Sequence, residues 1–211
     1  MGRPIEIDRE QAFRAALALF WQRGYQGTSL RELLHATGMG KGSFYAAFGS
    51  KEALFRSALD WYHQWTLAAK REIAAEHQGL SALRAFLGAT LIGVRAPKRR
   101  RGCLLVNSVV ELAETEPALH RLAARYLRLL EHTCLEYLEQ AAAAGELRPA
   151  LTPATLAPLV ATLIEGLRVD ARLGTGPGAL QQRVDALLEL VTPDRTQPAP
   201  ASASQRRGQT A

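Results

Sequence analysis

The sequence has little cysteine and no long apolar run. Cys103 and Cys134 are its two cysteines among 211 residues, too few for a disulfide framework, so we expect free thiols in a reducing compartment. No apolar stretch approaches the roughly 20 residues that a membrane-spanning helix needs, and residues 1–9 do not predict a signal peptide. We therefore expect a cytoplasmic protein with no membrane association.

The sequence also lacks the motifs that indicate an enzyme. Its five histidines are scattered without metal-ligand spacing, and no phosphate-binding loop or nucleophile elbow is present. The glycine-rich segment 174–178 does not follow a strand, so it does not indicate a dinucleotide site. We expect no catalytic residue, no metal site and no cofactor.

Strand-like alternation is missing as well, and an apolar period near 3.6 residues predicts an all-α protein of about nine helices. Asp8 is placed to cap a first helix that Gly24 ends, and Ser29-x-x-Glu32 forms a capping box for a second, although Thr28 is an alternative cap. A third helix is expected at 41–48, and a fourth from Ser50 to about residue 76. Longer helices rich in Leu and Ala are expected near 80–95, 103–115, 117–144, 153–173 and 178–191.

The segment 28–51, TSLRELLHATGMGKGSFYAAFGSK, has the pattern of a helix-turn-helix. Gly38 supplies the positive φ of a tight turn between two short helices. The second helix leaves Lys41, Ser43, Tyr45 and Ala47 on its outer face, and a helix of this kind fits the major groove of DNA. The net charge of +6 and the pI near 9.7 suit a polyanionic partner.

The run GYQGTSLRELLHATGMGKGSFYAAFGSKEALF resembles the N-terminal domain of the tetracycline-repressor (TetR) family, over about the first sixty residues. The resemblance implies a dimeric transcriptional regulator, usually a repressor that a small-molecule ligand or thiol modification releases from a palindromic double-stranded DNA operator. It implies a base contact from Arg31 and base or phosphate contacts from the start of the third helix. The implied DNA-binding residues are Thr28, Arg31, Lys41, Gly42, Ser43, Tyr45 and Lys51. Packing for Tyr45 and simple solvation for Lys51 remain alternatives.

The same resemblance divides the chain into three parts. Residues 1–50 form the helix-turn-helix domain, 51–191 a helical ligand-sensing and dimerisation domain, and 192–211 a tail whose Pro, Ala, Ser and Gln content predicts disorder. The helices near 153–173 and 178–191 are expected to pair with their symmetry mates, although packing within one subunit is the alternative. The apolar residues expected at that interface are Leu156, Leu159, Leu163, Leu167, Leu180, Val184, Leu187, Leu188 and Val191.

An effector pocket is expected by family analogy among the central helices, from about residue 51 to 144. Its candidate lining residues, each of which could instead be core or surface, are Trp61, Trp65, Phe86, Asn107, Glu111 and Tyr126. Cys103 follows the run Lys98-Arg99-Arg100-Arg101-Gly102 at an expected helix N-terminus, and both features favour a reactive thiolate.

The phrase GCLLVNSVVELAE, which begins at Gly102, is similar to a branch of the family that senses oxidants or electrophiles through a cysteine at this position. Core packing is the alternative for Cys103, and it is our expectation for Cys134. An alternative hypothesis for the function of the whole chain is a helical interaction module that binds RNA or membrane through the basic run 98–101. That module would bind without regard to DNA sequence.

Overall fold

The computed structural model describes residues 8–92 and 100–193, and every regular element in these ranges is helical. The α-helices are α1 (Arg9–Arg23), α2 (Leu30–Thr37), α3 (Lys41–Phe48), α4 (Lys51–Ala74), α5 (Gly79–Leu87), α7 (Leu104–Leu112), α8 (Pro117–Ala143), α9 (Pro153–Leu173) and α10 (Pro177–Val191). A π-helical turn, η1 (Gly88–Ile92), continues α5. The predicted all-α fold is confirmed; residues 93–95 of one expected helix and 194–211 of the expected tail lie outside the described residues.

The N-terminal helices begin and end where the capping residues predict. Asp8 accepts from the Glu10 backbone N–H at 2.9 Å at the start of α1. Ser29 is the cap of α2, because its hydroxyl accepts from the Glu32 N–H at 3.3 Å while the Glu32 carboxylate accepts from the Ser29 N–H at 2.8 Å. Gly38 then takes a left-handed conformation, with φ of 68°. The short turn that results separates α2 from α3.

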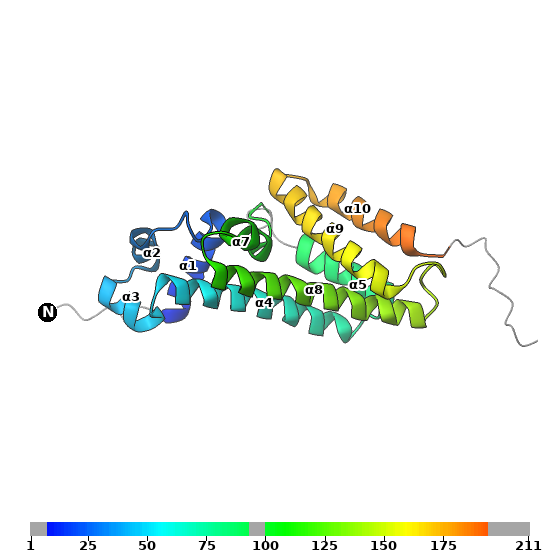
Figure 1. The fold of residues 1–211 in the computed structure, drawn as a ribbon, viewed down its shortest axis with the longest axis horizontal. Coiled ribbons are helices and arrows are strands. Elements are labelled where there is room, and N and C mark those ends of the chain that lie inside the picture. The colour runs from blue at the N-terminus through cyan, green and yellow to red at the C-terminus, as the bar shows by residue number, and fades with distance from the viewer. Residues whose placement is uncertain (1–7, 93–99, 194–211) are drawn as a thin grey trace, which may run out of the picture.

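The helices form an elongated molecule in which α4 and α8 run along the long axis (Figure 1). Helices α1, α2 and α3 lie at one end, and α9 and α10 lie on one side of the other half. Helix α7 sits between α1 and α9 and packs on α8. Since α4 starts directly after α3 and continues into the other half, it links the helix-turn-helix to the remaining helices.

The apolar side chains form two buried clusters. One joins α1–α4 to α7 and the start of α8, and it includes an edge-to-face contact of Phe20 with Phe55 at 4.9 Å between ring centroids. The other joins α5, the later part of α8, α9 and α10. The first cluster therefore continues across residue 50, the boundary expected between the two domains.

Candidate DNA-binding surface and effector site

Helix α3 presents most of its expected outer face to solvent, but Ala47 of that face is partly buried against the first apolar cluster. Lys41, Gly42 and Ser43 are exposed, and the Tyr45 side chain is 42% exposed. Phe44 points the other way and is fully buried, with its ring edge-on to that of Tyr45 at 5.8 Å. The turn and the buried Phe44 thus hold Lys41, Gly42, Ser43 and Tyr45 at the surface of α3.

Arg31 is exposed on the neighbouring helix α2 and lines a surface pocket of about 390 Å³ with Leu19, Arg23, Glu32, His35 and Ala36. Arg23 forms an ion pair with Glu32 across this pocket. Arg31 has no ion pair among the described residues, so its guanidinium is available to an outside partner.

Two of the expected DNA-contact residues are less accessible. Thr28 is fully buried, and its hydroxyl donates to the Gly24 carbonyl oxygen at 2.7 Å. Lys51 is half-buried, with Nζ 4.3 Å from the centre of the Tyr25 ring. Burial lowers the pKa of Lys51, while nearby carboxylates, Glu111 first among them, oppose this shift.

Helix α7 is attached to the loop that precedes α2. The Glu111 carboxylate accepts from the backbone N–H groups of Tyr25 at 3.1 Å and Gln26 at 2.7 Å. Gly24 lies beside it with φ of 78°, a conformation that favours glycine, and a Cβ there would lie 2.4 Å from a Glu111 oxygen. Glu111, expected to line a pocket, instead joins α7 to the DNA-binding helices.

Cys103 lies at the N-cap of α7, as the sequence predicts, and it is buried, as the alternative of core packing requires. Arg168 of α9 donates from Nη1 to the Cys103 Sγ at 2.8 Å. Tyr62 of α4 also hydrogen-bonds to this thiol, and burial raises the pKa of Tyr62, so its hydroxyl keeps its proton. Lys98 and Arg99 of the basic run lie outside the described residues.

A narrow cavity of about 20 Å³ lies among α4, α7, α8 and α9, where Arg168 meets Tyr126. The other residues that line it are His63, Thr66, Leu67, Leu105, Leu129, Leu130 and Thr133. Tyr126 donates to Asp60 at 2.5 Å, and its ring stacks on that of His63 at 4.2 Å. Of the residues proposed from the sequence as pocket lining, only Tyr126 borders this cavity.

The remaining candidates lie elsewhere. Phe86 is fully buried in the second cluster, tilted against Tyr137. Trp61 is 39% exposed, and Trp65 is half-buried against Tyr62.

Asn107, the remaining candidate, donates to the Arg101 carbonyl oxygen and accepts from Arg172. None of these four candidates lines the narrow cavity.

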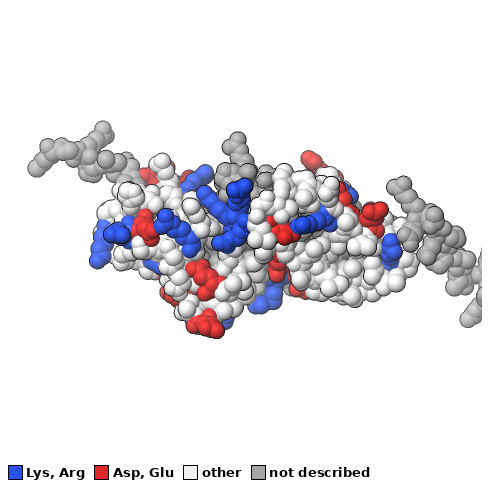
Figure 2. Space-filling model, turned by 90° about the horizontal axis from the view of Figure 1, so that it is seen from above, with Lys and Arg blue, Asp and Glu red and all other residues white. Residues whose placement is uncertain are grey.

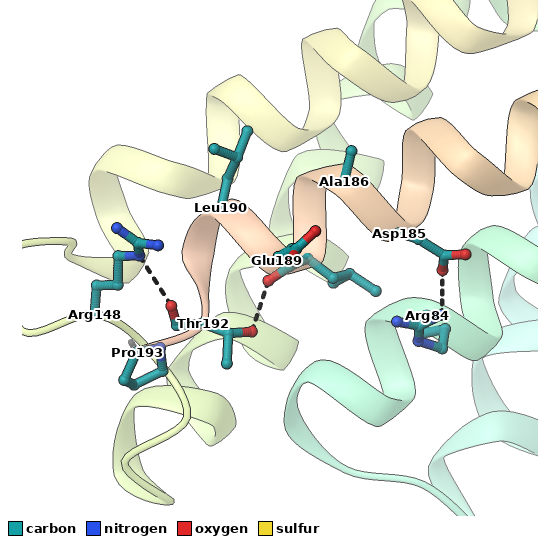
Figure 3. Close-up of a pocket in the computed structure, with 9 residues that line it drawn as sticks. Arg84, Arg148, Asp185, Ala186, Glu189, Leu190, Thr192 and Pro193 are labelled. Atoms are coloured by element: carbon teal, nitrogen blue, oxygen red, sulfur yellow. Dashed lines mark hydrogen bonds and ion pairs between the residues drawn. The ribbon is translucent and has the colours of Figure 1, made fainter. Parts of the chain in front are cut away.

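A wider groove of about 840 Å³ runs along the end of α10 (Figure 3). Three of its charged side chains contact neighbours: Asp185 pairs with Arg84, and the Arg148 Nε donates to the Thr192 carbonyl oxygen at 2.9 Å. In contrast, the buried polar atoms that lack a partner in the described part of the chain are Tyr137 Oη and the Nε and Nη2 atoms of Arg168. We therefore place the candidate effector site at the narrow cavity.

The outer side of α9 carries an apolar stripe. Leu159, Val169 and Leu173 are 62%, 49% and 79% exposed, and Leu190 of α10 is 67% exposed. White surface and scattered charged groups alternate on the side of the molecule that Figure 2 shows. Of the apolar residues expected at the interface, Leu159 is exposed, whereas Leu156, Leu167, Leu180, Val184, Leu188 and Val191 are buried inside the monomer.

Two negative findings concern the described ranges alone. No group of three His, Cys, Asp or Glu side chains in residues 8–92 and 100–193 is placed to hold a metal ion. Within the same ranges, no helix has the length and hydropathy required to cross a membrane.

Comparisons with known proteins match both halves of the chain to one family. Residues 13–58 match the model described as "Bacterial regulatory proteins, tetR family", and residues 79–187 match "Tetracyclin repressor-like, C-terminal domain". The chain is 34% identical over 193 residues to the HTH-type transcriptional repressor ComR of Escherichia coli K12, covering 90% of this chain and 91% of that protein. It is 26% identical over 181 residues to the repressor BdcR of the same organism, covering 82% and 83%.

Solved structures give the same result. A cysteine mutant of the TetR family regulator CifR, complexed with 26-bp operator DNA, superposes with a TM-score of 0.73 at 28% identity, covering 90% of this chain and 100% of that chain. A TetR family regulator from Agrobacterium tumefaciens has the same fold, with a TM-score of 0.79 at 21% identity, covering 87% and 97%.

Proposed function

Since this chain belongs to the TetR family and is a helix-turn-helix transcriptional regulator, we propose that it represses genes by binding a palindromic operator as a homodimer. A small-molecule effector, or modification of Cys103, would release it from the DNA. The observation that most directly supports this proposal is the exposure of Lys41, Gly42, Ser43 and Tyr45 on α3, beside Arg31 of α2. We expect it to act in the cytoplasm, and as a regulator rather than an enzyme.

The proposed base contacts come from Arg31, Lys41 and Ser43, with the Gly42 backbone close to the phosphates. Tyr45 and Lys51 are proposed phosphate contacts at the edge of the groove. The burial of Thr28 supports a packing role for its side chain. We therefore propose that Thr28 contributes to DNA binding only through its backbone, which precedes α2. The exposure of Arg31 and its lack of a described ion pair support its assignment as a base reader.

A dimer is proposed because one helix-turn-helix makes too few contacts for a specific site, and paired half-sites lie about 34 Å apart, one turn of DNA. The exposed stripe of Leu159, Val169 and Leu173 supports an interface formed by α9 and α10. The proposed domains remain 1–50 for DNA binding, 51–191 for sensing and dimerisation, and 192–211 as a tail.

The proposed release mechanism uses the two connections between the halves. Helix α4 begins beside α3 and lines the narrow cavity through His63, Thr66 and Leu67. Helix α7 lines it through Leu105 and holds the loop before α2 through Glu111. An effector that separates these helices would bias the molecule toward a form in which the two recognition helices no longer match the half-sites.

Thiol modification is the second proposed trigger. Any group added to the Cys103 Sγ would displace the Arg168 and Tyr62 side chains that contact it, because the thiol is only 2% exposed. The test compares operator release by a small electrophile in the wild type, Cys103→Ser and Cys134→Ser. Release that persists in Cys103→Ser would exclude this trigger.

The operator and the dimer are tested together. In vitro selection of bound DNA should return an inverted repeat, and light scattering should give twice the subunit mass. Leu173→Glu combined with Val169→Glu should yield monomers that lose operator binding, while Val110→Glu, which alters an exposed valine of α7, should not. DNA binding that ignores sequence would overturn the proposal.

A further inference from the structure

Arg168 is a buried cation whose hydrogen-bonding capacity is mostly unused. The residue is 4% exposed, and within the described ranges Nη1 is its one nitrogen with a partner, the Cys103 Sγ at 2.8 Å. Nε and Nη2 have none among the described residues. Because a buried charge without compensating hydrogen bonds is costly, a residue of this kind is retained where it does something besides stabilise the fold.

The two unpartnered nitrogens define the shape of a partner. Nε and Nη2 lie on the same edge of the planar guanidinium, with parallel N–H bonds. That edge matches the two oxygens of a carboxylate in a bidentate pair. Nη1 donates to the Cys103 Sγ, and this hydrogen bond fixes the orientation of the guanidinium plane.

No carboxylate of the described chain takes this position. Glu165 lies one turn earlier on α9, and its charge interacts with Arg168, but the two form no ion pair. Burial raises the pKa of Glu165. The cavity that Arg168 lines therefore has one cation and no paired anion facing it.

The rest of the cavity wall is mainly hydrocarbon. Leu67, Leu105, Leu129 and Leu130 line it with the rings of His63 and Tyr126. The hydroxyls of Thr66 and Thr133 donate to carbonyl oxygens of their own helices. A single cation in an apolar wall favours a monoanion with an apolar body over a phosphate dianion, whose second charge would be uncompensated.

We propose that Arg168 is the anion-binding residue of the effector site and that the effector is a small organic monocarboxylate with an apolar body. The carboxylate pairs with Nε and Nη2, and its hydrocarbon part lies against the leucines of α7 and α8. This inference deepens the proposed function, because it names the chemical class of the ligand that would release the operator.

The size of the cavity links binding to movement. A cavity of about 20 Å³ has room for little more than one water molecule. A carboxylate with several carbon atoms fits only if α4, α7 or α8 moves away from α9. Binding at Arg168 thus selects a conformation in which the helices attached to the DNA-binding end have shifted.

The experiment uses the purified full chain and three matched probe pairs: butyrate and butyramide, hexanoate and hexanamide, benzoate and benzamide. Calorimetry measures binding, and fluorescence anisotropy of labelled operator, found by selection, measures release. We expect at least one carboxylate to bind at millimolar concentration and its amide at least about tenfold more weakly, because the amide loses the charge-assisted pair.

Arg168→Met removes the charge at similar length and should weaken carboxylate binding at least about tenfold while operator binding without ligand persists. Arg168→Lys keeps the charge but loses the bidentate edge, so it should be intermediate. Arg172→Met, one turn further along α9 and exposed, is the matched control and should bind the carboxylate as the wild type does.

The outcomes separate this site from the proposed function. The site is overturned if no carboxylate binds the wild type, if amides bind equally well, or if Arg168→Met binds undiminished. Carboxylate binding that depends on Arg168 but leaves the operator occupied supports the site and overturns ligand-released repression. Failure of the wild type to bind any operator overturns the proposed function, whatever the calorimetry shows.

Discussion

The Glu111 carboxylate accepts a hydrogen bond from the Tyr25 backbone N–H at 3.1 Å, across 86 residues of sequence. Gln26 donates to the same carboxylate at 2.7 Å. The loop between α1 and α2 has few regular hydrogen bonds of its own, so this contact sets its position relative to α7. The start of α2 is therefore tied to the same helix whose N-cap is Cys103.

Glu111→Ala should reduce stability and weaken the response of DNA binding to effector. Two N–H groups lose a charged acceptor, and hydrogen bonds to charged groups contribute about 1.5–3 kcal/mol each, so we expect a loss of about 2 kcal/mol or more. Urea unfolding measures it. Glu114→Ala, an exposed carboxylate just after α7, should cost little. Equal effects of the two variants would contradict the role given to Glu111.

Arg168→Met should stabilise the protein in the absence of carboxylates. Replacing a buried, poorly compensated cation with an apolar side chain of similar length is expected to raise the free energy of unfolding by about 1–3 kcal/mol. Urea unfolding in a buffer free of organic anions provides the measurement. A large destabilisation would show that the bond to Cys103 makes Arg168 a structural residue.

Cys134 should not react with thiol reagents in the folded protein. Burial raises its pKa to about 12, so almost no thiolate exists at neutral pH. Mass spectrometry after brief iodoacetamide treatment should find Cys134 unmodified in the native protein and alkylated after unfolding. The Cys103→Ser variant should then show no native labelling, and labelled Cys134 in that variant would contradict the expectation.

Acidification should destabilise the protein through His63. Burial lowers the pKa of His63 below its ordinary 6.5, with Arg125 adding to the shift and Asp60 opposing it. The unfolded chain then takes up a proton before the folded chain does, so stability is complete above that ordinary value and is lost as the pH falls through it. Unfolding at about pH 7.5 and about pH 5.5 should show a smaller loss for His63→Phe than for the wild type. His132→Phe, altered at an exposed site on α8, should behave as the wild type.

Arg31 and Lys51 should affect DNA binding differently. Arg31→Ala should weaken operator binding by about 1–3 kcal/mol and relax specificity at one base pair. Lys51→Ala should weaken binding to all sequences and reduce the salt dependence by about one counterion. Lys70→Ala, near the far end of α4 and paired with Glu136, is the control. A gel-shift series in which neither Arg31→Ala nor Lys51→Ala binds operator more weakly than the Lys70→Ala control would contradict these assignments.

The helix boundaries could be predicted because local chemistry determines them. Asp8, Ser29 and Ser50 cap helices through their own side chains, and Gly38 makes the turn by its own conformation. Burial of whole helices depends on long-range packing, which a single sequence does not contain. The sequence therefore did not separate the exposed Leu159 from the buried Leu156 and Leu167 on α9, and it left open whether Phe86 lines a pocket or belongs to the core, where the structure places it.

Arg168 was missed although its position carries a signal. It lies in an apolar series on α9 with Ala157, Ala161, Ile164 and Ala171, all buried. A charged residue at this spacing marks a cation turned toward the interior. What it contacts depends on Cys103 and Tyr62, which belong to other helices, and no pattern within α9 indicates them.

The buried cluster that joins α1–α4 to α7 and α8 has a consequence for engineering and for evolution. The DNA-reading helices are not an interchangeable module, because cutting after α3 would expose Phe20 and Leu33, and cutting after α4 would expose Leu104. Chimeras that transplant a new operator preference onto this regulator must also match the residues of α7 that pack beneath the transplanted helices. Recombination between paralogues would face the same requirement, so new specificities should arise here more readily by point changes on the exposed face of α3 than by exchange of the whole segment.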